Sequence, residues 1–192
     1  MLRKLICATA LLLGSWAQAH AAPVLSVTAA SSSVTVGNSF TLDIFITGVS
    51  DLYGWQLDLD FGLPGLANAS APTVGDFLGL PGDQTFGAGT VNNTTGHITT
   101  IFSALSGTTG VSGDGVLAHV SFLAMLQGTL AVSLSNFSLL DSNLDSIFTS
   151  NPLGATVDIS DPGGGTTPEP SSILLVALGL ACCAFRLRRS KT

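Results

Sequence analysis

Apolar and polar side chains alternate every two residues along the middle of this chain, a pattern that limits the region to β-structure. The apolar members of the longest run are Tyr53, Trp55, Leu57, Leu59 and Phe61. A period of two places them on one face of a strand, which is then half-buried. Residues 40–47 alternate in the same way, and residues 48–51 have the composition of a turn. The sequence therefore predicts two successive strands joined by a turn.

Six further short runs have strand-like composition and are bounded by Gly, Asn, Asp, Ser or Pro. These runs are Val24–Thr28, Ile98–Leu105, Val116–Met125, Leu130–Leu134, Phe137–Leu140 and Thr156–Ile159. Many short strands without helical crossovers predict an all-β fold, and we expect an antiparallel jelly-roll sandwich. Residues 62–90 are rich in Gly and Pro and are predicted to form a long irregular connection with one short strand.

The N-terminus has the order of a secretory signal peptide. Arg3 and Lys4 precede an apolar stretch, residues 5–16, which is followed by spaced alanines. Signal peptidase reads small residues at this spacing. We therefore predict a signal peptide at residues 1–21, cut after Ala21, with Ala19 as the alternative site.

The C-terminus combines a Pro-Glu-Pro motif at 168–170, an apolar run and a cluster of cations. The cations are Arg186, Arg188, Arg189 and Lys191. A helix over residues 171–185 would reach only about 22 Å, whereas the hydrocarbon core of a membrane is about 30 Å thick. A transmembrane helix this short predicts a temporary anchor.

These three parts, in this order, resemble the PEP-CTERM sorting signal of exported proteins from bacteria that make extracellular polysaccharide. In that family the membrane enzyme exosortase cuts near the motif and releases the protein or transfers it toward the cell surface. The resemblance implies that Pro168, Glu169 and Pro170 form the recognition motif. It also implies a transient inner-membrane helix at 171–185, a cytoplasmic basic stop behind it, and a destination at the cell surface or in the extracellular matrix. An ordinary C-terminal tail anchor is the alternative.

Charge is distributed unevenly between the ends and the body. All six Lys and Arg residues lie in the two terminal segments, and all twelve acidic residues lie between Asp43 and Glu169. The exported part therefore has no Lys or Arg. Binding to nucleic acid is excluded, because contact with phosphates needs Lys or Arg to displace counterions.

The body offers few residues for catalysis. Its histidines are His97 and His119, it has no cysteine, and it has no Gly-x-Ser-x-Gly motif. Asp58 and Asp60 lie about 7 Å apart on one face of a predicted strand, a distance within reach of glycosidase chemistry. We interpret them as a solvated face, with a glycosidase as the alternative. The prediction is a protein that is not an enzyme.

One segment has part of the spacing of a calcium loop. Asp141, Asn143 and Asp145 alternate as the first oxygen ligands of such a loop do. Ser146 stands where the sharp turn needs glycine, and Pro152 where a bidentate glutamate is needed. We interpret the segment as a polar β-turn, with a weak calcium site as the alternative, and predict no other cofactor.

Aromatic residues on an exposed sheet can bind sugar rings, and Tyr53 and Trp55 are the candidates. They share a predicted face with Leu57, Leu59 and Phe61. The sequence therefore favours packing in the core over a sugar-binding platform.

A second resemblance covers the body of the chain, from Val24 to Ser160. The segments that carry it are Ser33-Val-Thr-Val-Gly-Asn-Ser-Phe-Thr-Leu-Asp-Ile, Val49-Ser-Asp-Leu-Tyr-Gly-Trp-Gln-Leu-Asp-Leu and Asn136-Phe-Ser-Leu-Leu-Asp-Ser-Asn. They resemble a cohesin domain, which implies a jelly roll of about nine strands related to carbohydrate-binding modules. The expected organisation is a cohesin-like domain at 22–160, a Gly-rich linker at 161–167 and the sorting signal at 168–192.

Two functions follow from these expectations. The first is a surface or matrix protein whose cohesin-like domain serves adhesion or assembly, with a dockerin-like protein as its partner. The second is a carbohydrate-binding module for the polysaccharide of the producing cell. The enzymes expected to process the chain are signal peptidase and exosortase.

Overall fold

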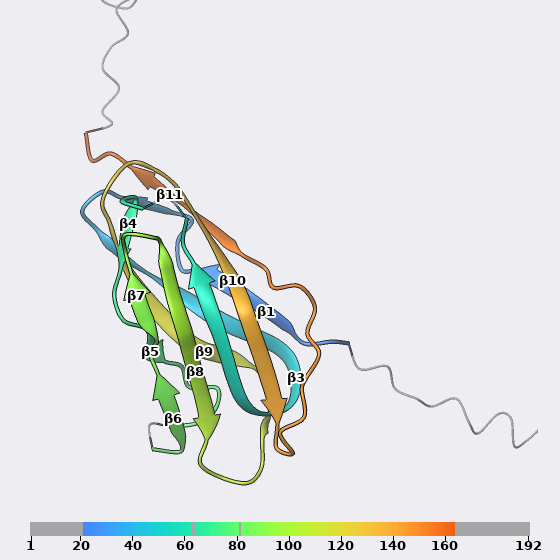
Figure 1. Cartoon of the computed structure of the whole chain (residues 1–192). Helices are drawn as coiled ribbons and strands as arrows, with labels where there is room; N and C mark the ends of the chain where they lie inside the picture. Colours follow the sequence, from blue (N-terminus) through green and yellow to red (C-terminus); the bar gives the residue numbers. More distant parts are fainter. Residues whose placement is uncertain (1–20, 63, 81, 164–192) are drawn as a thin grey trace, which may run out of the picture.

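The computed structural model describes residues 21–62, 64–80 and 82–163 and shows an all-β sandwich (Figure 1). The fold class predicted from the sequence is confirmed. The strands are β1 (Val24–Ala29), β2 (Ser33–Thr35), β3 (Ser39–Asp60), β4 (Ala67–Ala69), β5 (Thr73–Val74), β6 (Gln84–Gly87), β7 (Thr90–Asn92), β8 (His97–Leu105), β9 (Val111–Ala124), β10 (Gly128–Asp141) and β11 (Ala155–Ser160).

Two layers pack face to face and share the long strand β3. In the first layer, β3 pairs with β1 and β9, and β4 and β5 pair with the other edge of β9. In the second layer, the strand order is β11-β10-β3-β8-β6, and β7 also pairs with β8. These pairs are antiparallel, whereas β2 and β11 form a parallel pair.

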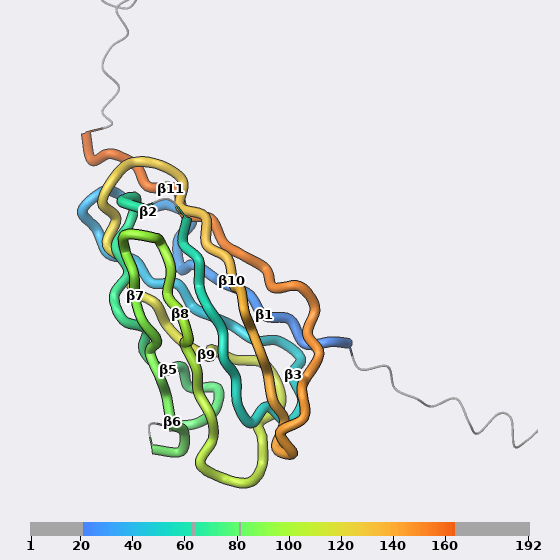
Figure 2. Tube along the Cα trace, in the orientation of Figure 1, coloured from blue at the N-terminus to red at the C-terminus, as the bar shows by residue number. Residues whose placement is uncertain are grey.

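Strand β3 passes between the layers at a corner, where the sequence predicts a turn (Figure 2). Pairing with β9 continues through this corner, with register shifts on both sides of Val49. Gly48 and Asp51 have positive φ angles of 69° and 58°. Extra residues at bulges bend and twist a strand without ending its ladder. The predicted turn between two separate strands is therefore wrong, and the corner belongs to one strand.

The core lies between the layers and is built by the alternation along β3. Leu42, Ile44 and Ile46 face inward from its first half, and all three have no exposed surface. Trp55, which is 3% exposed, faces inward from the second half together with Leu57. Each large apolar side chain buried in this way contributes about 1.5–3 kcal/mol. The prediction of core packing is confirmed for Trp55, whereas Tyr53, on the same predicted face, is only half-buried.

Other predicted elements differ in detail. The runs 130–134 and 137–140 form one strand, β10, which is interrupted opposite β3 by a bulge between Ser135 and Ser138. In its described residues, the region 62–90 contains three short strands, β4, β5 and β6, instead of one, and β7 begins at its last residue. Two of them pair with β9 and the third pairs with β8. They exist through contacts with distant strands, so the local sequence pattern does not reveal them.

Several predicted features lie outside the described residues. These are residues 1–20 of the signal peptide with Ala19, the motif Pro168, Glu169 and Pro170, the helix 171–185, and the cations Arg186, Arg188, Arg189 and Lys191. Across 21–62, 64–80 and 82–163, no helix has the length and apolar character needed to cross a membrane.

Candidate binding face

The second layer has an outer face, formed by β10, β3, β8 and β6, that points away from the core. Along β3, Trp55, Leu57 and Leu59 are buried, so the residues between them face outward. The outward residues of β3 are Gly54, Gln56, Asp58 and Asp60. The face is divided along the strands into an apolar part and an acidic part.

The apolar part contains a shallow hollow of about 380 Å³. Its lining residues are Gly54, Trp55, Gln56, Phe102, Ser103, Ala104, Ser138 and Leu140. Gly54 and Ala104 are direct partners across β3 and β8, and the lack of a large side chain at either position leaves room for the hollow. Trp55 and Ser103, which are 3% and 1% exposed, form the floor. The hollow has no ionisable residue in its lining.

Phe102 forms the aromatic rim of the hollow and is 37% exposed. Its ring lies against Gly87 of β6, where an added Cβ would lie only 2.0 Å from a ring carbon of Phe102. Glycine therefore allows the ring to lie flat against the edge strand. Gln56 is the partner of Phe102 in register, and Ser138 is the partner of Gln56 on the other side. A row of side chains thus crosses β10, β3 and β8 and ends at Gly87 of β6.

Asp58 occupies the centre of the acidic part and binds both neighbouring strands. The main-chain N–H of Thr100 on β8 donates to its Oδ1 (2.6 Å), and the Asn136 side-chain amide on β10 donates to its Oδ2 (2.7 Å). Thr100 and Asn136 have positive φ angles of 59° and 47°. Both are next to register shifts in the pairing with β3. One carboxylate therefore holds two bulges in place.

Asp60 repeats this arrangement two residues further along β3. Its Oδ1 contacts Nδ1 of His97 on β8, and its Oδ2 accepts a hydrogen bond from the Ser135 hydroxyl on β10 (2.7 Å). Asp60 lies on the outer face as predicted, but its carboxylate is bound on both sides. Hydrogen bonds of this kind fix the relative positions of strands. The geometry favours a structural role for the pair Asp58 and Asp60 over a glycosidase role.

The second histidine of the body lies in the other layer. His119 on β9 faces Asp43 on β3, and its Nδ1 lies 2.7 Å from the carboxylate Oδ1. The two side chains are 40% and 39% exposed. The structure does not bring His119 near His97, so the two histidines do not share a site.

Asp51 at the corner of β3 connects three segments at the lower end of the molecule. The Ser142 hydroxyl donates to its Oδ2 (2.7 Å), and the main-chain N–H of Gly110 donates to its Oδ1 (3.0 Å). The Ser142 hydroxyl is the main cause that holds the pKa of Asp51 below its ordinary value. Desolvation acts in the opposite direction, and the main-chain N–H groups of Ser142 and Gly110 add to the lowering. The sequence predicts only a turn at residues 48–51 and does not reveal these contacts.

The predicted calcium segment forms a turn in the structure. Oδ1 of Asp141 accepts hydrogen bonds from the main-chain N–H groups of Asn143 and Asp145, both at 2.9 Å. Leu144 has a positive φ of 67°, and its N–H donates to the Asp141 carbonyl. In the part of the chain that the structure describes, no group of three or more His, Cys, Asp or Glu residues is placed to hold a metal ion. The geometry supports the polar β-turn.

The sequence did not single out Phe102 and the hollow. The run 98–105 predicts a strand, but the bulge near Thr100 changes the phase of its alternation. As a result Ile98 and Ile101, which are three residues apart, both point inward, and Phe102 points outward. The one sign of this in the sequence is that the apolar residues of the run 98–105 do not keep a strict spacing of two.

Comparison with known proteins finds matches for the C-terminal segment and for the sandwich. A family model described as the PEP-CTERM protein-sorting motif matches residues 166–189. No curated protein matches the chain.

Solved structures match the sandwich. A non-cellulosomal cohesin from Archaeoglobus fulgidus is 19% identical with a TM-score of 0.57, and the match covers 72% of this chain and 91% of that one. The second type II cohesin module of the adaptor ScaA scaffoldin of Acetivibrio cellulolyticus is 15% identical with a TM-score of 0.61, covering 78% and 96%. The sixth cohesin of scaffoldin B from Acetivibrio cellulolyticus, solved in complex with the Cel5 dockerin, is 16% identical with a TM-score of 0.58, covering 72% and 99%. At these identities the likeness shows the fold.

Proposed function

We propose that this chain, which carries a PEP-CTERM protein-sorting signal behind a cohesin-like sandwich, is a non-catalytic binding module sorted by exosortase to the cell surface or extracellular matrix. The match at residues 166–189 supports the sorting, and the cohesin fold supports the binding role. In this proposal signal peptidase removes residues 1–21. The helix 171–185 then holds the chain in the inner membrane until exosortase cuts near Pro168, Glu169 and Pro170.

The outer face is the surface that we assign to the protein partner. It combines the hollow, the exposed ring of Phe102 and the polar side chain of Gln56. A central apolar anchor surrounded by polar groups is the usual anatomy of a protein interface. Two of the matching cohesins were solved in complexes with dockerins. We therefore propose a dockerin-like protein as the partner, which makes the module an adhesion or assembly unit.

The position of the hollow suits a module tethered by its C-terminus. In Figure 1 β11 ends at the upper end of the sandwich, where the described chain leaves toward the sorting signal. The hollow lies near the ends of β8 and β10, at the lower end. A partner would therefore bind at the part of the module furthest from the tether.

The charge of the body adds a requirement for the partner. Asp58 and Asp60 lie beside the hollow, and the body contains no Lys or Arg. Complementary charge increases the association rate and excludes wrong partners. We therefore expect a partner that presents an apolar side chain to the hollow and Lys or Arg to the acidic part.

Mass spectrometry of the extracellular protein tests the sorting. We expect an N-terminus at Ala22 and a C-terminus near Pro170, because both terminal segments are removed. A chain with alanines in place of Pro168, Glu169 and Pro170 should stay in the membrane fraction. Recovery of secreted protein that still contains Arg186 and Arg188 would refute sorting by exosortase.

Titration with a dockerin-like protein from the same cell tests the binding face. Phe102→Ala should weaken binding about tenfold or more, since a central aromatic anchor contributes roughly 2 kcal/mol or more. Leu123→Ala is the matched control, because Leu123 is 40% exposed on a strand of the other layer. Equal loss of binding in both variants, or no loss in either, would contradict the assignment of this face.

A further inference from the structure

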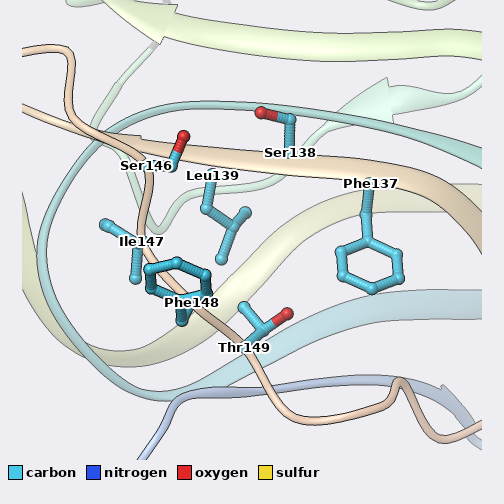
Figure 3. Close-up of a pocket in the computed structure, with 7 residues that line it drawn as sticks. All are labelled: Phe137, Ser138, Leu139, Ser146, Ile147, Phe148 and Thr149. Atoms are coloured by element: carbon cyan, nitrogen blue, oxygen red, sulfur yellow. The ribbon is translucent and has the colours of Figure 1, made fainter.

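A second depression lies on the other side of β10 from β3 (Figure 3). It has a volume of about 230 Å³. It is lined by Phe137, Ser138 and Leu139 of β10 and by residues 146–149 of the segment that follows. The N–H of Ile147 donates to the carbonyl of Leu139 (2.9 Å), which holds this segment against the strand. We call this depression the side groove.

Two phenyl rings stand at the side groove with little cover. Phe148 is 88% exposed, and Phe137 is 36% exposed. Figure 3 shows both rings, with the side chain of Thr149, on the same side of β10. Phe137 belongs to the bulge that begins at Asn136, and bulges commonly redirect a side chain. The two rings line the same depression and together form an exposed apolar surface, and contiguous exposed apolar surfaces mark interaction sites.

The hydroxyl groups of the side groove are free. Ser138, Ser146 and Thr149 make no side-chain hydrogen bond to any other residue that the structure describes. In contrast, the hydroxyls of Ser135 and Ser142 are bound to carboxylates at 2.7 Å. Figure 3 shows the Thr149 hydroxyl on the side of β10 that carries the two rings, and the Ser138 and Ser146 hydroxyls on the opposite side. A hydroxyl both donates and accepts, so Thr149 can form hydrogen bonds in both directions with a ligand that packs on the rings.

The lining contains no ionisable side chain, so the ligand that fits it is uncharged. Aromatic faces together with free hydroxyls suit a sugar ring, which has an apolar C–H face and hydroxyls at its edge. An apolar peptide side chain would use the rings but would bury the Thr149 hydroxyl without a partner, which is costly. The volume holds one sugar unit rather than a whole oligosaccharide.

We propose that the side groove binds a neutral pyranose unit of a polysaccharide, with Phe148 and Phe137 as the packing surface and Thr149 as a hydrogen-bonding residue. Ser138 lines both the side groove and the hollow of the outer face, so the two depressions adjoin across β10. A longer glycan can therefore continue from the side groove toward the outer face. This site goes beyond the proposed protein-binding role and does not depend on it.

Saturation-transfer NMR with the full chain in a detergent that lacks a sugar headgroup tests the site. The probes are the neutral methyl glycosides of glucose, galactose and mannose and their β-linked oligomers, with methyl glucuronide as the charged comparison. We expect transfer to the ring C–H protons of a neutral sugar. Phe148→Ala should reduce affinity about tenfold, since an aromatic contact and its buried area together reach about 1.4 kcal/mol. Thr149→Val should reduce it about threefold.

The matched control is Leu126→Ala, because Leu126 is 60% exposed but lies in the connection between β9 and β10, away from the side groove. It should bind sugar as the unchanged chain does. Phe148→Ala should keep its melting temperature, because its ring is almost fully exposed.

Three results would overturn the proposal: no transfer to any neutral sugar, equal transfer to the unchanged chain and Phe148→Ala, or saturation of the side groove by a phenylalanine-containing peptide without sugar binding. The measurement involves no protein partner. Its failure would leave the assignment of the outer face untouched.

Discussion

The acidic and apolar parts of the outer face lie side by side on the same strands but are built differently. In the acidic part, Asp58 and Asp60 each accept hydrogen bonds from or contact both neighbouring strands. In the apolar part, the small residues Gly54 and Ala104 leave room for the hollow, and Phe102 remains partly exposed. The side chains of the acidic part are used to hold the strands together, whereas those of the apolar part are available to a partner.

This difference separates stability from binding. Loss of a carboxylate such as that of Asp58 leaves donors on two strands without an acceptor, so the free energy of unfolding should fall. Changes to the rim of the hollow affect groups with few internal contacts, so the fold should tolerate them. Variants of the two parts, with a residue beneath the hollow as a reference, therefore test whether stability and binding are separated in this way.

The largest effect on the free energy of unfolding is expected at Trp55, beneath the hollow. Trp55→Ala should destabilise the domain by about 3–5 kcal/mol, because it removes a large buried ring from a packed core. The indole Nε1 of Trp55 is buried without a hydrogen-bond partner in the part of the chain that the structure describes. Trp55→Phe should therefore cost much less. Urea denaturation measures both variants, and an equal cost for both would show that the indole nitrogen has a partner after all.

The next effect is expected at the centre of the acidic part. Asp58→Ala should cost on the order of 2 kcal/mol, because two hydrogen bonds to a charged group are lost and both are partly exposed. Asp58→Asn keeps one acceptor oxygen and should cost less. Urea denaturation again gives the free energy of unfolding. If Asp58→Ala leaves the free energy of unfolding unchanged, the two bulges do not depend on this carboxylate. The acidic part would then contribute no more to stability than the apolar part.

The sequence predicts much of the fold because alternation is a local property. The alternation at residues 40–47 and 53–61 identifies both halves of β3 and their inward residues. Short strands such as β4 and β5 depend on pairing with β9, more than 40 residues away in the chain. Their sequences contain too few residues to show a period.

The candidate sites are harder to predict than the fold. The bulges at Thr100 and Asn136 change which side chains face outward, and they are set by hydrogen bonds to Asp58 on a distant strand. The side groove also requires β10 and residues 146–149 to lie together. The carboxylate that determines these positions was visible in the sequence, but its partners were not.

A smaller effect is expected from pH, through Asp51. Since its pKa is lowered in the folded state, the carboxylate favours folding above the ordinary pKa of an aspartate, about 3.9. That contribution is lost as the pH falls below this value and through the lowered pKa of the folded state. Asp51→Asn should therefore lose less stability between about pH 5 and pH 2 than the unchanged chain does. Thermal melts across this range measure the difference, and parallel curves would show that Asp51 does not contribute.

The smallest effect on stability is expected from filling the hollow. Ala104→Leu places a larger side chain on the outer face, where it points away from the core, so the free energy of unfolding should change by less than about 0.5 kcal/mol. Binding of a protein partner should nevertheless fall sharply, because the side chain occupies the space that the partner needs. Ala131→Leu is a suitable control, since Ala131 is exposed on β10, where it pairs with Thr156 of β11. Denaturation and partner titration on the same samples separate the two quantities. If Ala104→Leu lowers the free energy of unfolding strongly, the residues of the hollow contribute to stability. If Ala104→Leu binds the partner normally, the partner uses another surface.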